Sequence, residues 1–240
     1  MTRDLYTVAR KELLEILRTF RLRTLFSFAL YLLLFGAMPA LMIGPGFGQS
    51  PLAILYWVAL PVIVGAGVSI NSFAGERERK TLEMLLATCL PDRAILYGKI
   101  LAGVVYSLVF ILLAIAAGWL ALNFMQPEPV GFSPLVVLGG VTVGLLVAGL
   151  AALLGVLASL RAGTVRQAGR KLTVFYLLVA MPYFALSFLP DNMQIRVFQT
   201  IAELPDFGIL SVVVIGLILV IAILVILAEK RFQRNELILD

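Results

Sequence analysis

The sequence predicts an all-α membrane protein in which residues 1–240 form one transmembrane domain with six transmembrane helices. Hydrophobic residues make up 61% of the chain and charged residues only 14%, and the mean hydropathy is +1.03. Soluble domains carry about 25% charged residues. Six long apolar runs, separated by short polar loops, account for most of the chain. Because a soluble core cannot bury six such runs, we expect a helical bundle in a bilayer.

Each predicted span contains an apolar run of 18 to 26 residues. A helix rises 1.5 Å per residue, so this length matches a hydrocarbon core of about 30 Å. The spans are expected at residues 24–43, 52–74, 95–123, 134–160, 172–189 and 208–228. One face of the fourth span carries small residues at intervals of three or four, which allow another helix to approach closely: Gly140, Gly144, Ala148, Ala151, Gly155 and Ser159.

The positive charges predict the orientation in the membrane. Of the 19 Lys and Arg residues, 18 fall before the first span, between spans two and three, between spans four and five, or after the last span; the exception is Arg196. Basic residues concentrate on the cytoplasmic side of membrane proteins. We therefore expect a multi-pass protein of the cytoplasmic (inner) membrane with both termini in the cytosol. The net charge of +5 then reflects topology and lipid headgroup contacts, and no nucleic-acid partner is expected.

Two segments outside the spans have helical periodicity. In residues 1–22, apolar residues recur at helical spacing and mostly basic residues fill the opposite face, which predicts a helix lying in the membrane interface. This helix either only anchors the chain or also braces a partner. Residues 191–205, between the last two spans, predict a short outer helix.

The charged segment between spans two and three is the strongest indication of function. Residues 76–80 (Glu-Arg-Glu-Arg-Lys) predict a solvated turn, and residues 81–92 predict a short helix with Thr81 as its cap. Leu82, Leu85 and Leu86 form its apolar face, Pro91 ends it, and Asp92 is expected to cap the next helix. Two interpretations stay open at this point. A soluble partner that grips this short helix would pass its motion to both adjoining spans, or the helix only orders the loop.

This segment resembles the permease subunits of ABC type-2 transporters. Gly75–Thr88 matches the family's acidic-basic lead-in, followed by Thr-Leu-Glu, two leucines and Ala-Thr. Asp92–Lys99 matches the later Arg, Ile-Leu and Gly-Lys that precede the third span. The chain has Lys80 where glycine is usual and Cys89 where proline is usual. The number of spans, the cytosolic termini and the N-terminal interfacial helix fit the same family.

The resemblance implies an ATP-driven exporter in which two permease subunits, identical or different, form the translocation pathway. Two copies of a separate ATP-binding subunit would dock on the helix at 81–92, which is then a coupling helix. The residues implied in this coupling are Glu76, Glu78, Thr81, Leu82, Glu83, Leu85, Leu86, Asp92 and Arg93.

Other classes lack the residues they need. The chain has no G-x-x-x-x-G-K-[ST] phosphate loop, because Gly98-Lys99 is followed by Ile100 and lacks the earlier glycine. ATP and Mg²⁺ are therefore expected on a partner, and this chain is expected to be neither an enzyme nor a cofactor or metal binder. A secondary transporter generally needs ionisable residues within the bilayer, and the sequence predicts none of its 14 acidic residues inside a span. A structural or regulatory membrane subunit stays open as an alternative.

The pathway is expected to be apolar to mildly polar, since the six apolar runs contain no charged residue. Tyr56, Asn71 and Tyr183 are the main candidates to line it, and the further candidates are Tyr106, Ser107, Thr142, Tyr176 and Ser187. Such a lining suits lipidic, drug-like or peptide cargo better than small ions. Membrane lipid is the expected surroundings of the spans.

Overall fold

A computed structural model describes residues 2–18, 22–50, 52–126, 129–187 and 206–232 of the chain. Within these ranges, side chains are described except at residues 22–24, 52, 175, 178–187 and 206–210. The described part consists of helices joined by short turns and loops, and it has no strand. The outer helix expected at residues 191–205 lies outside the described residues.

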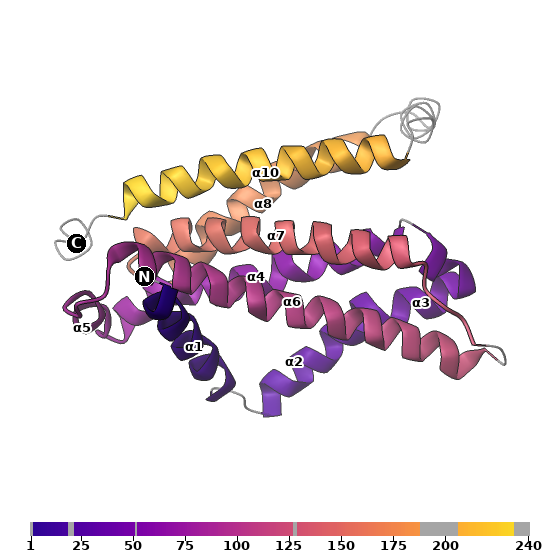
Figure 1. Ribbon diagram of the computed structural model, residues 1–240, viewed down its shortest axis with the longest axis horizontal. Helices are drawn as coiled ribbons and strands as arrows, with labels where there is room; N and C mark the ends of the chain where they lie inside the picture. The colour runs from indigo at the N-terminus through magenta and orange to yellow at the C-terminus, as the bar shows by residue number, and fades with distance from the viewer. Residues whose placement is uncertain (1, 19–21, 51, 127–128, 188–205, 233–240) are drawn as a thin grey trace.

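Long helices run along the bundle (Figure 1), as expected from the apolar runs. The first is interrupted: α2 (Leu22–Leu32) passes through a π-helical turn (Leu33–Ala37) into α3 (Met38–Ile43), and a 3₁₀ turn (Gly44–Gln49) follows. The others are α4 (Leu52–Glu78), α6 (Asp92–Met125), α7 (Pro134–Leu160), α8 (Val165–Ser187) and α10 (Asp206–Arg231).

Five segments in the described residues are long and apolar enough to cross a membrane: Leu25–Gln49, Ala53–Glu78, Asp92–Met125, Pro134–Leu160 and Ser211–Arg231. They correspond to five of the six predicted spans. The remaining predicted span, 172–189, falls mostly on α8, which is not one of the five. A total of six spans therefore stays a prediction.

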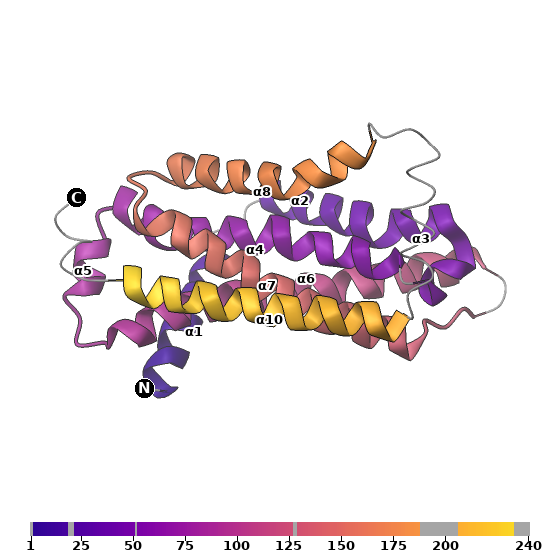
Figure 2. The same cartoon turned by 90° about the horizontal axis from the view of Figure 1, so that it is seen from above.

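Helix α7 is the centre of the bundle and packs against α4, α6, α8 and α10 (Figure 2). About half of the apolar stretch of α7 is buried in the bundle, whereas only 6% of the apolar stretch of α10 is buried. Helix α10 is therefore peripheral. The small residues of α7 explain the close packing. A Cβ atom added at Gly140 would lie 2.5 Å from the Trp57 ring, and one at Gly155 would lie 2.7 Å from Ser69. A Cβ atom at Gly144 would lie 2.8 Å from Ile111, so the predicted small-residue face packs against both α4 and α6.

The two ends of the bundle differ in composition. One end, which we call the basic end, holds α1 (Thr2–Arg18), the short helix α5 (Leu82–Leu86) and the α7–α8 junction. Helix α1 crosses the long helices obliquely and packs on α6, where a Cβ atom at Gly98 would lie 2.7 Å from Val8. At the opposite end, Phe47, Trp57 and Phe132 form an aromatic cluster with ring centroids 5.8 to 6.2 Å apart, and Phe47 meets the other two rings edge to face.

Candidate functional site

The segment between α4 and α6 is more compact than predicted. Helix α5 has five residues, Leu82–Leu86, rather than the predicted range 81–92. Thr81 precedes α5 but makes no capping bond to it, since its hydroxyl donates to the Glu76 carbonyl at 3.3 Å. The next helix begins at Asp92 with Pro91 at the cap position, so Asp92 lies in the first turn and is not the cap.

The leucines of α5 point into the bundle and do not offer an exposed apolar face. Leu82 and Leu86 are each only 4% exposed and belong to a core cluster that includes Phe73 of α4 and Ile95 of α6. Leu85 packs against the same cluster. Leu82 and Leu86 therefore anchor α5 to the two flanking helices, Leu85 is half-buried beside them, and a docking role for the leucines stays a prediction.

The outer face of α5 is formed by Glu83 and Met84, and Met84 is 67% exposed. Any soluble partner that reaches α5 meets these two side chains first. Of the two, the sequence prediction named only Glu83.

The turn that leads into α5 adopts a left-handed conformation at Lys80, with φ of 57°. The backbone N–H of Lys80 donates to Arg77 O, and that of Thr81 donates to Glu76 O at 2.9 Å. These two bonds form a Schellman motif, which requires a left-handed residue and is usually completed by glycine. This is the position at which the family pattern has glycine, so Lys80 keeps the turn at a conformational cost.

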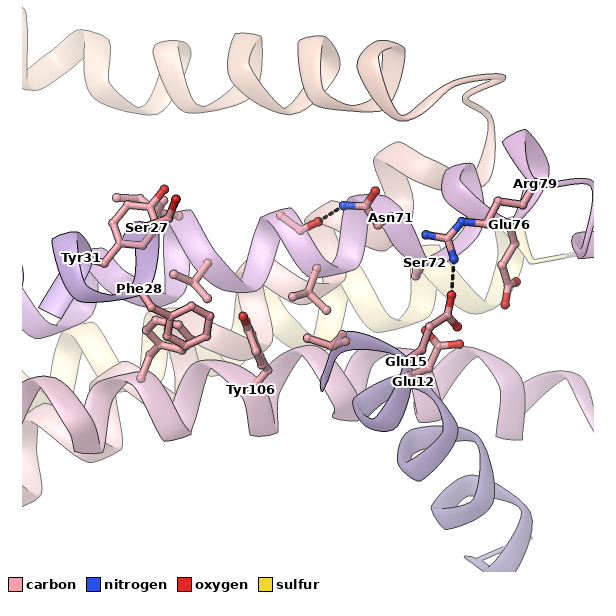
Figure 3. A pocket seen from close by; sticks show the side chains of 16 residues that line it. Glu12, Glu15, Ser27, Phe28, Tyr31, Asn71, Ser72, Glu76, Arg79 and Tyr106 are labelled. Carbon is pink, nitrogen blue, oxygen red and sulfur yellow. Dashed lines mark hydrogen bonds and ion pairs between the residues drawn. The ribbon is translucent and has the colours of Figure 1, made fainter. Parts of the chain in front are cut away.

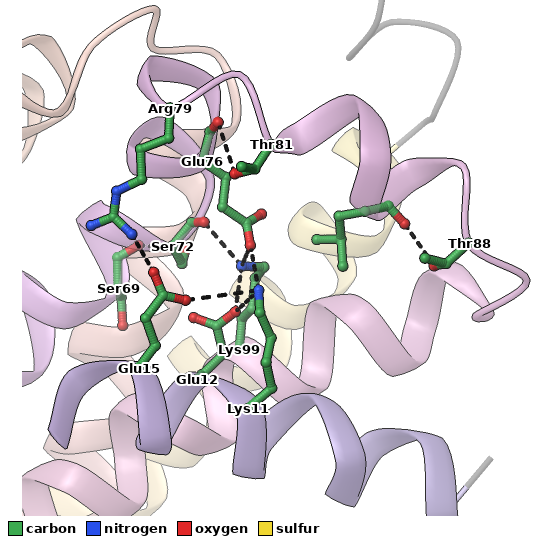
Figure 4. Close-up of polar contacts among 11 residues, drawn as sticks. Lys11, Glu12, Glu15, Ser69, Ser72, Glu76, Arg79, Thr81, Thr88 and Lys99 are labelled. Atoms are coloured by element: carbon green, nitrogen blue, oxygen red, sulfur yellow. Dashed lines mark hydrogen bonds and ion pairs between the residues drawn. The ribbon is translucent and has the colours of Figure 1, made fainter. Parts of the chain in front are cut away.

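A buried lysine joins α6 to α4 and α1 (Figure 4). Lys99 is 1% exposed, and its Nζ lies 2.8 Å from Glu12 Oε1 and 3.1 Å from Glu76 Oε1. The same Nζ donates to the Ser72 carbonyl at 2.9 Å and lies 5.0 Å from the centre of the Phe73 ring. The buried cation is thus paired and hydrogen-bonded, as burial of a charge requires.

Helix α1 completes this charge network. Lys11 Nζ lies 2.9 Å from Glu76 Oε1 and 3.4 Å from Glu12 Oε1, and Arg79 pairs with Glu15. Partial burial lowers the pKa of Lys11, but the hydrogen bond to Glu76 and the nearby carboxylates outweigh it, so the pKa is raised above 10.5. The three acids and three bases, Lys99 included, sum to zero charge.

This network corrects two predictions. Glu76 is 6% exposed and does not lie in a solvated turn, because α4 continues to Glu78 and carries it into the bundle. The interior is also not free of charge, since Glu76 and Lys99 are both buried. One signal could have found Glu12: it follows Val8 by four residues, on the face of α1 that is buried.

Two further residues of α4 reach the α7–α8 junction. Arg77 donates to the carbonyls of Ala162 at 2.7 Å and Leu160 at 3.2 Å, where α7 ends. The Glu78 carboxylate accepts the backbone N–H of Val165 at 2.8 Å, where α8 begins. Both satisfy backbone groups that a helix terminus leaves unpaired.

A third set of contacts links α6 to α10. Arg93 Nε lies 3.2 Å from Glu229 Oε1, and the Tyr97 hydroxyl donates to the same oxygen at 2.9 Å. Glu76, Glu78 and Arg93, which were predicted to couple to an ATPase, therefore have partners within the chain. The end of α4 and the start of α6 are tied to α1, α7, α8 and α10.

A cavity of about 440 Å³ lies between α1, α2, α4 and α6, next to the charge network (Figure 3). Of the predicted pathway residues, Asn71 lines it and donates to Gly67 O at 2.7 Å. Tyr106 lines it as well. Tyr56 does not line the cavity; its ring lies near Phe47, with ring centroids 6.1 Å apart. The Tyr183 side chain lies outside the described residues. In the described part of the chain, no group of three or more His, Cys, Asp or Glu side chains could hold a metal.

The apolar helices and their packing define a multi-pass membrane protein. The family model described as ABC-2 family transporter protein matches residues 45–207, which is more than half of the chain. The chain belongs to this family and is a permease of an ABC transporter, and membership implies association with an ABC ATP-binding subunit. A search of the curated proteins finds no match.

Proposed function

We propose that this permease is part of an ATP-driven exporter in the cytoplasmic membrane and forms the translocation pathway with a second permease subunit. The basic end then faces the cytosol, together with both termini. Two ATP-binding subunits supply ATP and Mg²⁺ and drive the permease from that side. Family membership and the distribution of Lys and Arg support this assignment.

The observation that carries the proposal is the anchoring of α5. Its buried residues Leu82 and Leu86 pack on both α4 and α6, while Glu83 and Met84 are exposed. A packed core is close to incompressible, so it transmits displacement rather than absorbing it. A partner that pushes the exposed face of α5 therefore moves the ends of α4 and α6 together.

The charge network extends this movement to the rest of the basic end. Glu76 and Lys99 connect α4 and α6 to α1, and Arg77 and Glu78 connect α4 to α7 and α8. In this proposal these residues carry the coupling inside the permease, and the outer face of α5 receives it.

The alternatives differ in what they require. An ion-driven carrier needs a carboxylate that can exchange its cation, but Glu76 Oε1 lies within 3.1 Å of both Lys11 and Lys99. A structural or regulatory subunit would also bind an ATPase but would move no cargo. Transport is therefore the property that separates the exporter from this second alternative.

Met84→Asp and Met125→Asp form a matched pair for the test. The two methionines are 67% and 69% exposed, at α5 and at the far end of α6 respectively. A charge in the centre of a docking surface costs several kcal/mol, so Met84→Asp should reduce co-purification of the ATP-binding subunit by roughly tenfold or more. Met125→Asp should leave it unchanged.

The same two variants, in vesicles that also contain the ATP-binding subunit, test transport. We expect nucleotide-dependent accumulation of cargo to be lost with Met84→Asp and retained with Met125→Asp. Equal capture and equal transport for the two variants would contradict docking at α5. Normal capture without any transport by the unmodified protein would favour the structural subunit.

A further inference from the structure

The cavity beside the charge network has two chemically different ends (Figure 3). Phe28 and Tyr31 of α2 lie at one end, and Glu12, Glu15 and Glu76 lie at the other. Tyr106 and Asn71 lie between them, as the labelled side chains show. The cavity therefore runs from an aromatic region within the bundle to a carboxylate-rich region at its basic end.

The aromatic end is a continuous surface. The ring centroids of Phe28 and Phe110 are 4.1 Å apart, those of Tyr106 and Phe110 are 5.1 Å apart, and those of Phe28 and Tyr106 are 6.0 Å apart. Ile63 and Val64 of α4 add aliphatic lining. Such a wall favours an apolar body and pairs well with another aromatic ring.

The polar end is rich in hydrogen-bond acceptors. Among the described residues that line the cavity, Glu12, Glu15 and Glu76 are acidic and Arg79 is the single base. Lys11 and Lys99 pair with these acids but do not line the cavity. Because the six charges sum to zero, selectivity at this end comes from the acceptor atoms that face the cavity and not from net charge.

One acceptor is left without a partner. Glu76 is only 6% exposed, and its Oε2 atom is buried with no hydrogen bond, whereas Oε1 contacts both lysines. A buried carboxylate oxygen without a donor is costly, and a ligand that supplies an N–H recovers that cost. An anionic or purely accepting group would meet three carboxylates, and Arg79, the base that lines this end, already pairs with Glu15.

We propose that this cavity binds substrates that carry a protonated amine on an apolar, preferably aromatic, body. The amine donates to the carboxylate end, and the body packs against the wall that Phe28 and Tyr106 form. A volume of about 440 Å³ falls in the range of small-molecule sites, roughly 300 to 1,000 Å³. As a statement about cargo, this inference depends on the proposed exporter function; as a statement about binding, it does not.

The test measures binding of tritiated 4-phenylbutylamine to the purified full-length permease in phosphatidylcholine nanodiscs, without ATP or any partner. 4-Phenylbutyrate has the same body with a carboxylate in place of the amine. We expect the amine to bind more tightly by about tenfold or more, because charge-assisted hydrogen bonds discriminate strongly in a buried site. Equal affinities for the two compounds would overturn the proposal.

Two variants locate the site. Glu76→Gln should weaken amine binding by about tenfold, since a neutral amide oxygen accepts a weaker hydrogen bond than a carboxylate oxygen. Tyr106→Leu should weaken it by about threefold, through loss of the aromatic contact. Tyr56→Leu, at a tyrosine that does not line the cavity, is the matched control and should leave binding unchanged. Thermal unfolding of each variant verifies its fold. If Glu76→Gln is unstable, Tyr106→Leu alone tests the site. Unchanged amine affinity in Tyr106→Leu would show that the amine binds elsewhere, whether or not Glu76→Gln folds.

Nanodiscs that contain phosphatidylethanolamine separate two sources of such an amine. Weaker binding of 4-phenylbutylamine in these discs indicates that the lipid headgroup occupies the site, and equal binding indicates a free amine; both support recognition of an amine. Because the assay contains no nucleotide, loss of binding here leaves docking at α5 intact. Loss of ATPase capture in Met84→Asp likewise leaves this site intact.

Discussion

The two ends of the bundle are held together by different forces. At the end opposite α1, aromatic rings and close helix contacts pack around Trp57, which is fully buried against Gly140. At the basic end, ion pairs and hydrogen bonds around Lys99 link helices that are far apart in the sequence. Apolar packing depends on fitted shape, whereas a buried charge depends on specific partners. The comparison teaches that a few named pairs hold the basic end, so single substitutions there should cost the most.

Lys99→Met should have the largest effect, because it breaks the buried network. The change leaves the buried Glu76 and the partly buried Glu12 with less compensation, and removing one partner of a buried ion pair costs about 3 to 5 kcal/mol. The free energy of unfolding in mixed micelles measures this loss. Lys230→Met, at an exposed residue near the end of α10, is the control and should change stability by less than about 0.5 kcal/mol. A similar small effect for both variants would mean that the network does not hold the basic end.

Gly140→Ala tests the opposite end. The new Cβ would lie 2.5 Å from the buried Trp57 ring, and overpacking of this kind costs about 1 to 3 kcal/mol. Gly149→Ala, on the same helix, meets nothing nearer than Ile221 at 3.9 Å. It should be neutral or stabilising by up to about 1 kcal/mol, because alanine favours a helix over glycine. Equal melting temperatures for the two variants would show that α4 and α7 are not closely packed there.

Lys80→Gly should have the smallest effect and the opposite sign. A left-handed residue other than glycine costs about 1 to 2 kcal/mol, so glycine should stabilise the protein by about 1 kcal/mol. Lys80→Ala keeps the strained conformation and should not stabilise. Unfolding midpoints of the two variants decide this, and equal stabilisation by alanine would locate the effect in the lost charge rather than in the backbone.

The long helices could be predicted because hydrophobicity and length alone define a membrane helix. The family could be predicted from the segment around Thr81–Leu86, and the family model matching residues 45–207 confirms it. The total of six spans depends on α8, whose first turns carry Arg166, Arg170 and Lys171 next to its apolar part.

The interior of the site was less predictable. The pairing of Lys11 with Glu76 joins residues 65 positions apart, and no local pattern specifies such a contact. The burial of Leu82 and Leu86 depends on where α4 and α6 lie relative to each other, which a helical repeat does not define. Asn71 lines the cavity and Tyr56 on the same helix does not, and a pathway role for either residue stays a prediction.

The most direct test of coupling at α5 uses the chain's single cysteine, Cys89, which is exposed and follows α5 by three residues. A spin label on Cys89 reports local mobility in the complex with the ATP-binding subunit. Our account predicts that the label is immobilised when the subunit binds, that ATP changes its mobility again, and that Met84→Asp abolishes both changes. A label that stays equally mobile through binding and ATP hydrolysis, while cargo is transported, would contradict the account.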